Sequence, residues 1–356
     1  MSSELEQRLE GLFVAAPEPD PGAREEAMHR ALRALEPSTP PRRGLRAAMV
    51  VFAAVVVLLA IAAGSLAAAG ALHVSFGAKK KAQHPPAARL SLPRGANAIA
   101  AIVDGRLSVV TKGGFRLQGL PASAVALSPH ALYIAAGVGR SLVAMAPNGR
   151  RSWSHPAGGT FATIAWAPDG LRIAYVVRER HRSVLHVIWG NGTHDAVIDR
   201  SVRAVRPSWR ADSLAFAYVG AGGRAIVYDL AHRSRKVFGT AAPVTRLAFA
   251  PAGRTLMVAT PGAAYLGRKA VATGEVEAIG WFRGTPAVVL ESGVMPPLVQ
   301  TFSRSGSAVA SFRSHGRVLA VTPRFVVTGN SGKVVAGRGL VLSLFPGLTL
   351  RDLQIG

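Results

Sequence analysis

Cysteine is absent from the 356 residues, which excludes disulfide bonds and also zinc or iron–sulfur sites with cysteine ligands. The redox compartment stays open, because a cysteine-free domain is compatible with either side of a membrane. Aromatic residues are scarce at 6%, and charged residues make up 17% against 49% hydrophobic residues. This balance is too apolar for a disordered chain, and the length suits one large or two ordinary domains.

Catalytic motifs are also missing. The chain contains no G-x-S-x-G nucleophile elbow and no room for an α/β-hydrolase domain beside the repeats described below. Residues 328–333 (TGNSGK) lack the spacing of a phosphate-binding loop, and a hairpin turn explains them better. We therefore predict that the protein is not an enzyme and has no catalytic residue.

Histidines and acids form no obvious site either. The ten histidines are dispersed, and His181 and His186 are five residues apart, which places them on opposite faces of a strand. His194 and Asp195 occupy a predicted turn. Asp195 and Asp199 flank one predicted strand, where we expect solvated side chains rather than a glycosidase pair. We accordingly predict no metal site, no cofactor and no cofactor-binding residue.

Acidic residues are few, with 19 Asp and Glu against 42 Lys and Arg, so the net charge is +23. Residues 1–46 carry seven bases and eight acids, residues 47–94 five bases and no acid, and residues 95–356 30 bases and 11 acids. The last region is attracted to anionic surfaces such as phospholipid, acidic wall polymer or nucleic acid. No basic run exceeds Lys79-Lys80-Lys81, so a scattered arginine surplus from genome composition is the competing explanation.

One long segment has no charge at all, namely the 26 residues 47–72. At about 1.5 Å per residue, a helix of this length more than crosses a hydrocarbon core of about 30 Å. A cleaved signal peptide is disfavoured by the 46 preceding residues, although small-residue sites such as 67–69 exist. A buried soluble helix is disfavoured by the length. We predict an uncleaved transmembrane helix.

Basic residues flank this segment on both sides. The N-terminal side has Arg30, Arg33, Arg42, Arg43 and Arg46, and the C-terminal side has Lys79, Lys80 and Lys81. The small excess on the N-terminal side favours a cytoplasmic N-terminus. We expect a single-pass protein of the cell membrane, with a cytoplasmic tail and an extracytoplasmic main domain.

The tail, residues 1–46, contains two short amphipathic patterns at 2–13 and 22–36, separated and followed by proline-rich segments. Two such helices bury little core alone, so they are expected to dock on a partner or on each other. A tail with only nascent helix is the alternative. The layout of tail, span and envelope domain resembles that of membrane-bound anti-sigma factors of actinobacteria, which would imply a cytoplasmic partner for the tail.

A strand–turn–strand phrase recurs after a Lys- and Pro-rich linker at 73–94. The copies lie at 99–110, 124–136, 163–176, 207–219, 245–259 and, more weakly, 277–290 and 317–329. The residues that precede the turn in the last six copies are Leu127, Trp166, Trp209, Phe249, Trp281 and Val321, with spacings of 39, 43, 40, 32 and 40. A period near 40 with alternating polarity is typical of a β-propeller.

Each unit can be divided into four strands. In one unit, 163–167, 172–178, 183–189 and 194–200 are the expected strands, and Asn191-Gly192 marks a hairpin. Seven phrases favour seven blades over residues 95–356, and six remain an alternative. The first unit, 95–121, is one strand short. Either the C-terminal LTLRDLQI or ARLSLP at 88–93 is available to complete the ring.

The phrases WAPDGLRIAYV and PSWRADSLAFAYV resemble the repeat of TolB-type, WD-repeat-like β-propellers. The resemblance implies the fold and says little of function, since such propellers host many roles. Asp169 and Gly170 suit a tight turn, and Trp166 and Trp209 suit packing between blades. We therefore expect Asp169, Asp212, Trp166 and Trp209 to be structural.

The sequence thus predicts an all-β, membrane-tethered propeller of the bacterial envelope that binds a protein partner or senses a ligand. An anionic envelope polymer or lipid is a further expected partner, and nucleic acid is not expected. Two alternatives stay open. One is a transmembrane regulator whose tail binds a cytoplasmic partner, as an anti-sigma factor does. The other is an envelope enzyme or polymer-binding lectin with its site in the propeller channel.

Overall fold

The computed structural model describes residues 89–93, 96–113, 116–293, 295–314, 316–323, 326–330, 333–336, 339–343 and 350–355. All regular elements in these ranges are β-strands. None of the described residues belongs to a helix that could cross a membrane. The tail predicted at 1–46, the span predicted at 47–72 and residues 73–88 of the predicted linker lie outside the described residues.

The described strands form seven antiparallel sheets, which we number in chain order. Sheet 1 has the order β29 (Leu350–Ile355), β2 (Ala98–Val103), β3 (Arg106–Thr111) and β4 (Arg116–Pro121). Sheet 2 comprises β5 (Val125–Leu127), β6 (Ile134–Val138), β7 (Ser141–Met145) and β8 (Arg151–Pro156). Sheet 3 comprises β9 (Thr160–Trp166), β10 (Arg172–Arg178), β11 (Ser183–Trp189) and β12 (Ala196–Val202). Sheet 4 comprises β13 (Ser208–Trp209), β14 (Ala215–Val219), β15 (Ala225–Asp229) and β16 (Ser234–Phe238).

The remaining sheets repeat this plan. Sheet 5 comprises β17 (Arg246–Phe249), β18 (Leu256–Thr260), β19 (Ala263–Leu266) and β20 (Lys269–Thr273). Sheet 6 comprises β21 (Val276–Phe282), β22 (Thr285–Ser292), β23 (Met295–Phe302) and β24 (Ala308–Arg313). Sheet 7 comprises β25 (Arg317–Val321), β26 (Val326–Asn330), β27 (Lys333–Ala336), β28 (Gly339–Ser343) and, outermost, β1 (Arg89–Leu90).

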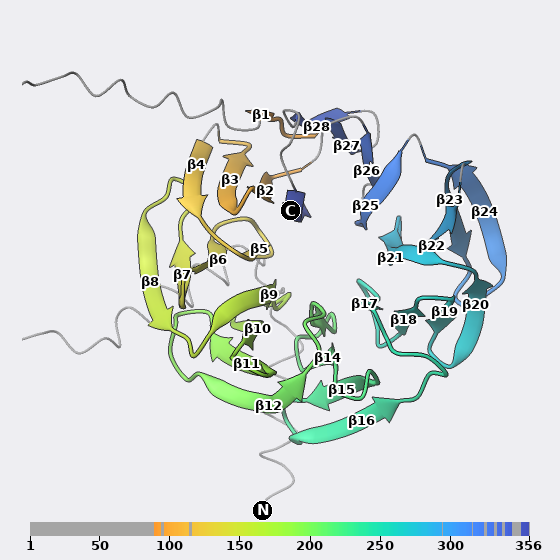
Figure 1. The fold of residues 1–356 in the computed structure, drawn as a ribbon, viewed down its shortest axis with the longest axis horizontal. Helices are drawn as coiled ribbons and strands as arrows, with labels where there is room; N and C mark the ends of the chain where they lie inside the picture. The colour runs from red at the N-terminus through yellow and green to blue at the C-terminus, as the bar shows by residue number, and fades with distance from the viewer. Residues whose placement is uncertain are drawn as a thin grey trace, which may run out of the picture. The chain divides into compact units, whose positions relative to one another are not determined.

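The sheets follow one another around a central space (Figure 1). The strands of each sheet are counted from the innermost outwards, so the first strand of sheet 1 is β29. Each sheet is open, and the arrangement is that of a β-propeller. The seven sheets of the described residues agree with the expected seven blades and not with six.

Both ends of the propeller sequence enter sheets begun elsewhere in the chain. β29 supplies the innermost strand of sheet 1 by pairing with β2, from Ile99 opposite Ile355 to Val103 opposite Leu350. β1 pairs with β28 and widens sheet 7. The two segments that the sequence offered as alternatives are therefore both used, and β1 lies within the predicted linker at 73–94.

The recurring phrase forms the first turn of each unit as its chemistry predicts. In sheet 3 the backbone N–H of Leu171 donates to Asp169 Oδ1 at 2.9 Å, and Gly170 has a φ of 74°. In sheet 4 the N–H of Leu214 donates to Asp212 Oδ1 at 3.0 Å. There Ser213 takes the left-handed conformation, with a φ of 57°. Both aspartates hold turns, as expected.

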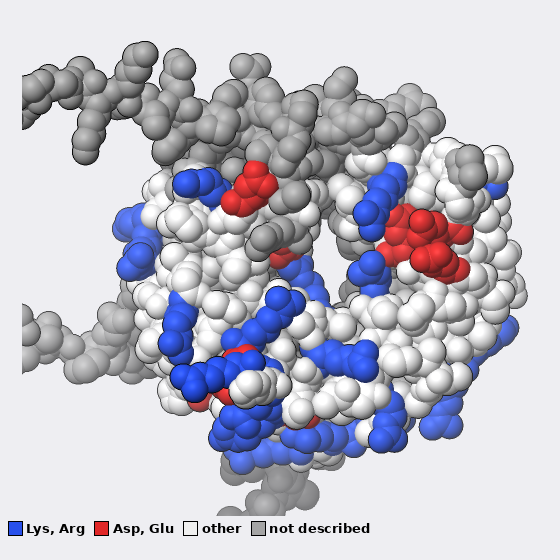
Figure 2. All heavy atoms as spheres, viewed as in Figure 1, with Lys and Arg blue, Asp and Glu red and all other residues white. Residues whose placement is uncertain are grey.

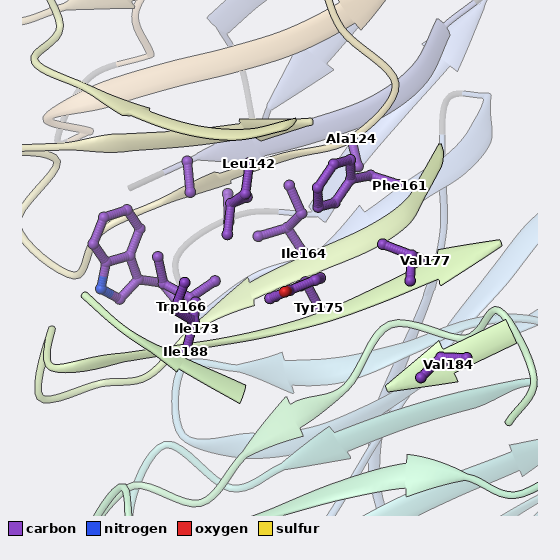
Figure 3. Packing of buried hydrophobic residues seen from close by; sticks show 12 residues of the cluster. Ala124, Leu142, Phe161, Ile164, Trp166, Ile173, Tyr175, Val177, Val184 and Ile188 are labelled. Carbon is purple, nitrogen blue, oxygen red and sulfur yellow. The ribbon is translucent and has the colours of Figure 1, made fainter. Parts of the chain in front are cut away.

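Buried side chains fill the spaces between neighbouring sheets. Figure 3 shows Ala124 and Leu142, from the sheet 2 unit, against Phe161, Ile164 and Tyr175 of sheet 3. Trp209 and Trp281, which precede turns, also join neighbouring sheets through their ring nitrogens. Trp209 Nε1 donates to Ala165 O of the preceding sheet at 3.0 Å, and Trp281 Nε1 donates to Ala248 O in the same way at 3.2 Å. Trp166 donates to Gly170 O within its own turn and lies in the buried cluster between sheets 2 and 3. Trp166 and Trp209 thus have the packing role predicted for them.

Candidate functional site

The propeller has two faces that differ in their loops. On one face lie the hairpins between the second and third strands, such as 139–140, 179–182 and 220–224, and the connections from one sheet to the next. We call this the hairpin face. On the opposite face lie the turns after the first and third strands, including 167–171 and 190–195. We call this the turn face. The antiparallel order of strands fixes which loops share a face.

A cavity of about 870 Å³ lies at the centre, where it contacts the innermost strands β9, β13, β17, β21, β25 and β29. Its walls are mostly small or apolar residues and backbone. Gly280 on β21 is required there, because a Cβ at this position would lie 2.5 Å from Val321 O on β25. Among the described residues lining this cavity, Asp352 is the sole acid, and Arg206 and Arg246 are the bases.

An ion pair on the cavity wall joins three sheets. Arg206, in the connection before β13, places Nη2 at 2.9 Å from Asp352 Oδ1 and at 2.7 Å from Oδ2. Arg206 also donates to Val125 O of β5 at 3.2 Å, while Asp352 Oδ2 accepts the N–H of Val125 at 3.1 Å. Arg206 and Asp352 therefore fasten the C-terminal strand to sheets 2 and 4.

A second charged group lies at the rim near sheets 5 to 7. Arg246 Nε donates to the backbone oxygen of Glu277 at 2.7 Å, and Arg317 Nε donates to Glu277 Oε1 at 3.0 Å. The Glu277 side chain is only 8% exposed. Burial lowers the pKa of the Arg246 guanidinium, which the Glu277 carboxylate opposes and Arg317 reinforces. Arg246 and Arg317 thus hold Glu277 from two neighbouring sheets at the rim.

Outside the cavity, Asp195 is the centre of a polar network between sheets 2 and 3. Tyr175 OH donates to Asp195 Oδ1 at 2.8 Å, His186 Nδ1 lies 3.0 Å from Oδ2, and His155 Nε2 lies 3.5 Å from the same oxygen. Burial raises the pKa of the Asp195 carboxyl, but the hydrogen bonds from His186 and Tyr175 and the nearby histidines outweigh it, so the pKa is lowered. Burial and the carboxylate raise the pKa of Tyr175.

Asp199 has an equivalent role one sheet further on. It accepts a hydrogen bond from Tyr218 OH at 2.9 Å, and Arg235 Nη1 lies 3.7 Å away. The side chains of Asp195 and Asp199 are only 19% and 17% exposed. The prediction that both are solvated is therefore wrong. Sequence reasoning missed these partners because Tyr175 and Tyr218 lie on other strands, although their shared place in IAYV and FAYV was a usable signal.

The histidines do not form a metal centre among the described residues, where no group of three or more potential ligands is found. His181 lies in the hairpin after β10, whereas His186 lies on β11 and contacts Asp195. The predicted hairpin at 330–333 is present as the pairing of Asn330 with Lys333 between β26 and β27.

No family model matches the chain, and no curated protein matches it. Among solved structures, TolB from Acinetobacter baumannii is similar at a TM-score of 0.45 and 14% identity, over 62% of this chain and 64% of that one. The chain thus spans less than two thirds of the length of that protein.

Proposed function

We propose that this chain is a non-enzymatic, membrane-tethered protein of the bacterial cell envelope, whose β-propeller binds a protein partner over the mouth of the central cavity on the hairpin face. The tether is the segment 47–72, with the N-terminus in the cytoplasm and the propeller outside. The observation that carries the proposal is the combination of this cavity with a hairpin face of strongly uneven charge.

The uneven charge is visible in Figure 2, where Lys and Arg gather over the sector of sheets 3 and 4 and Asp and Glu over β21 and β22. The acidic sector contains three glutamates near the start of β21 and the end of β22, namely Glu275, Glu277 and Glu291. A partner with basic side chains opposite the acidic sector is oriented before it makes contact. The central cavity then receives a side chain or loop of that partner.

The lining of the cavity favours binding over catalysis. Its acid, Asp352, is held by Arg206, so no second carboxylate on the described walls is available for the paired-carboxylate chemistry of the lectin-or-glycosidase alternative. Small side chains and fixed backbone groups instead suit a binding site that is already formed before its ligand arrives.

The proposal is tested by blocking the cavity. Thr245 is exposed on the hairpin face and lines the cavity, so Thr245→Trp places a bulky ring in its mouth. Tagged full-length protein is crosslinked in native membranes, and the captured proteins are quantified. We expect one partner to be enriched, with roughly tenfold lower capture by the variant, as for loss of a central interface contact.

Val237→Trp is the matched control, because Val237 is a neutral, exposed residue of β16 at the outer side of sheet 4. It should leave capture unchanged. Enrichment of no protein, or equal capture by the wild type and Thr245→Trp, would show that the cavity mouth does not bind a partner.

A further inference from the structure

A second cavity, of about 780 Å³, lies at the hairpin face between sheets 2 and 3. We call its charged lining the cationic pocket: Arg140 from the β6–β7 hairpin and Arg178, Arg180, His181 and Arg182 from the β10–β11 hairpin, with Glu179 as its acid. It lies in the sector where Figure 2 shows Lys and Arg gathered. The pocket has four arginines for one carboxylate.

Little of this positive charge is neutralised by the protein. Arg182 Nε pairs with Glu179 Oε2 at 2.8 Å, and both side chains are substantially exposed, so the pair is weak. Arg140 Nη2 donates to Gly158 O, a neutral acceptor, at 2.6 Å. Within the described ranges, the guanidinium groups of Arg178 and Arg180 have neither a hydrogen bond nor an ion pair, and both residues are exposed.

The direction of β1 shows on which side the chain enters the propeller. β25 starts at the hairpin face, so the fourth strand, β28, ends there. Arg89, the first residue of β1, pairs with Ser343, the last residue of β28. β1 therefore begins at the hairpin face, on the same side as the cationic pocket.

The predicted span ends at residue 72, so 16 residues, 73–88, connect it to β1. A segment of 16 residues reaches at most about 55 Å. A tether of this length keeps the hairpin face near the membrane and raises the effective concentration of lipid headgroups at the pocket.

We propose that the cationic pocket docks the hairpin face on anionic phospholipid headgroups of the membrane that holds the chain. This inference rests on the membrane tether in the proposed function. Arginine suits the ligand, because its planar guanidinium donates two parallel hydrogen bonds to a phosphate. The acidic sector at β21 and β22 is repelled by the same surface. The propeller thus docks tilted, with sheets 2 and 3 towards the lipid and the sheet 6 side of the cavity mouth left open to a partner.

The absence of cysteine allows a direct test on the full chain. A single cysteine is introduced at Thr160, an exposed residue of the pocket, or at Ala252, an exposed residue of the turn face, and labelled with a fluorophore. The protein is reconstituted in phosphatidylcholine nanodiscs with a nitroxide-headgroup lipid, with and without phosphatidylglycerol. We expect the Thr160→Cys label to be quenched only with phosphatidylglycerol, and the Ala252→Cys label to remain unquenched in both.

The arginines are then tested as a set. R178Q/R180Q/R182Q should weaken docking roughly 100-fold, since each basic residue near an anionic surface contributes about fivefold. R150Q/R268Q/R304Q removes the same charge from exposed turn-face positions and should leave quenching unchanged. Docking should also be lost at 1 M salt, where the Debye length falls to about 3 Å.

Three outcomes would overturn the inference. The first is a lack of quenching with phosphatidylglycerol in a chain that resists carbonate extraction. The second is an equal loss of quenching in the two triple variants. The third is binding of polyphosphate through Arg178, Arg180 and Arg182 without quenching by lipid. The first leaves the membrane tether and the partner proposal standing. Loss of partner capture with normal quenching would instead refute the proposed function alone.

Discussion

Sheets 3 and 4 differ from sheets 1 and 7 in how they are assembled. Each of sheets 3 and 4 uses four strands that follow one another along the chain. Sheet 1 takes its innermost strand, β29, from the C-terminus, and sheet 7 takes its outermost strand, β1, from the other end of the propeller sequence. The same architecture is therefore built from local hairpins in one region and from distant segments in the other.

The two regions are therefore expected to contribute to the stability of the domain in different ways. Local hairpins have short loops and a small entropic cost of closure. The pairing of β29 with β2 closes more than 240 residues, from Val103 to Leu350. It is held by the strand pairing itself and by Asp352, which Arg206 and Val125 fix from other sheets. We expect the joined ends to determine whether the ring holds together.

The largest expected effect follows from removing residues 350–356. Sheet 1 then loses its innermost strand, and the wholly buried β2 becomes an exposed edge. At about 1 kcal/mol for each lost backbone hydrogen bond, the unfolding free energy falls by about 5 kcal/mol or more. Chemical denaturation of the full chain should show a much lower midpoint and a greater tendency to aggregate.

A relocated strand provides the control. Ile355 lies opposite Ile99, so residues 350–355 inserted before β2 through a two-residue turn would pair with it as a local hairpin. This variant should recover most of the lost stability. If the truncated protein were as stable as the wild type, the ends would contribute nothing to the ring.

Trp209→Ala tests the local region, with a smaller expected effect. Trp209 is 7% exposed and links sheet 4 to Ala165 O of sheet 3. Its removal leaves a cavity and an unpaired carbonyl, so we expect a loss of about 3–5 kcal/mol in denaturant unfolding. Trp209→Phe should cost less, since it keeps most of the buried volume. A loss below 1 kcal/mol for Trp209→Ala would show that the contact between sheets 3 and 4 adjusts freely.

Much of sheets 3 and 4 was predicted from the sequence, because repeats and turn-forming residues are recognised from residues that are neighbours in the chain. β10 and β11 coincide with the predicted strands 172–178 and 183–189. The joined ends were predicted only as alternatives, since no local pattern says which distant strand completes a sheet.

The cationic pocket was not predicted at all. Arg140 and Arg178 are 38 residues apart, and only the packing of sheets 2 and 3 brings their hairpins together. The surroundings of Asp195 were also not predicted, because its partners Tyr175 and His186 lie on other strands.

The smallest expected effect is a pH dependence that distinguishes the Asp195 network of sheet 3 from the rest of the molecule. The pKa of Asp195 is lower in the folded protein than the value of about 4 that is ordinary for an unfolded aspartate. The ionised carboxylate therefore stabilises the fold above about pH 4, and this contribution is lost as the pH falls through the folded-state pKa. Because the side chain is partly exposed, we expect at most about 1 kcal/mol.

Asp195→Asn keeps an acceptor for Tyr175 OH but cannot ionise. The difference in unfolding free energy between this variant and the wild type should therefore shrink as the pH is lowered from 5 towards 2. Tyr175→Phe removes one of the two hydrogen bonds that lower the pKa, so its pH-dependent difference from the wild type should be smaller than that of Asp195→Asn. Urea midpoints measured at several pH values are sufficient, since acids remote from Asp195 contribute equally to all three proteins and cancel. The comparison stays at or below pH 5, because His155 and His186 face Asp195 and are not independent of its charge. A wild-type-to-Asn difference that is constant across this range would mean that Asp195 serves the fold only as a hydrogen-bond acceptor. The network would then be as insensitive to pH as the backbone pairing that joins the chain ends.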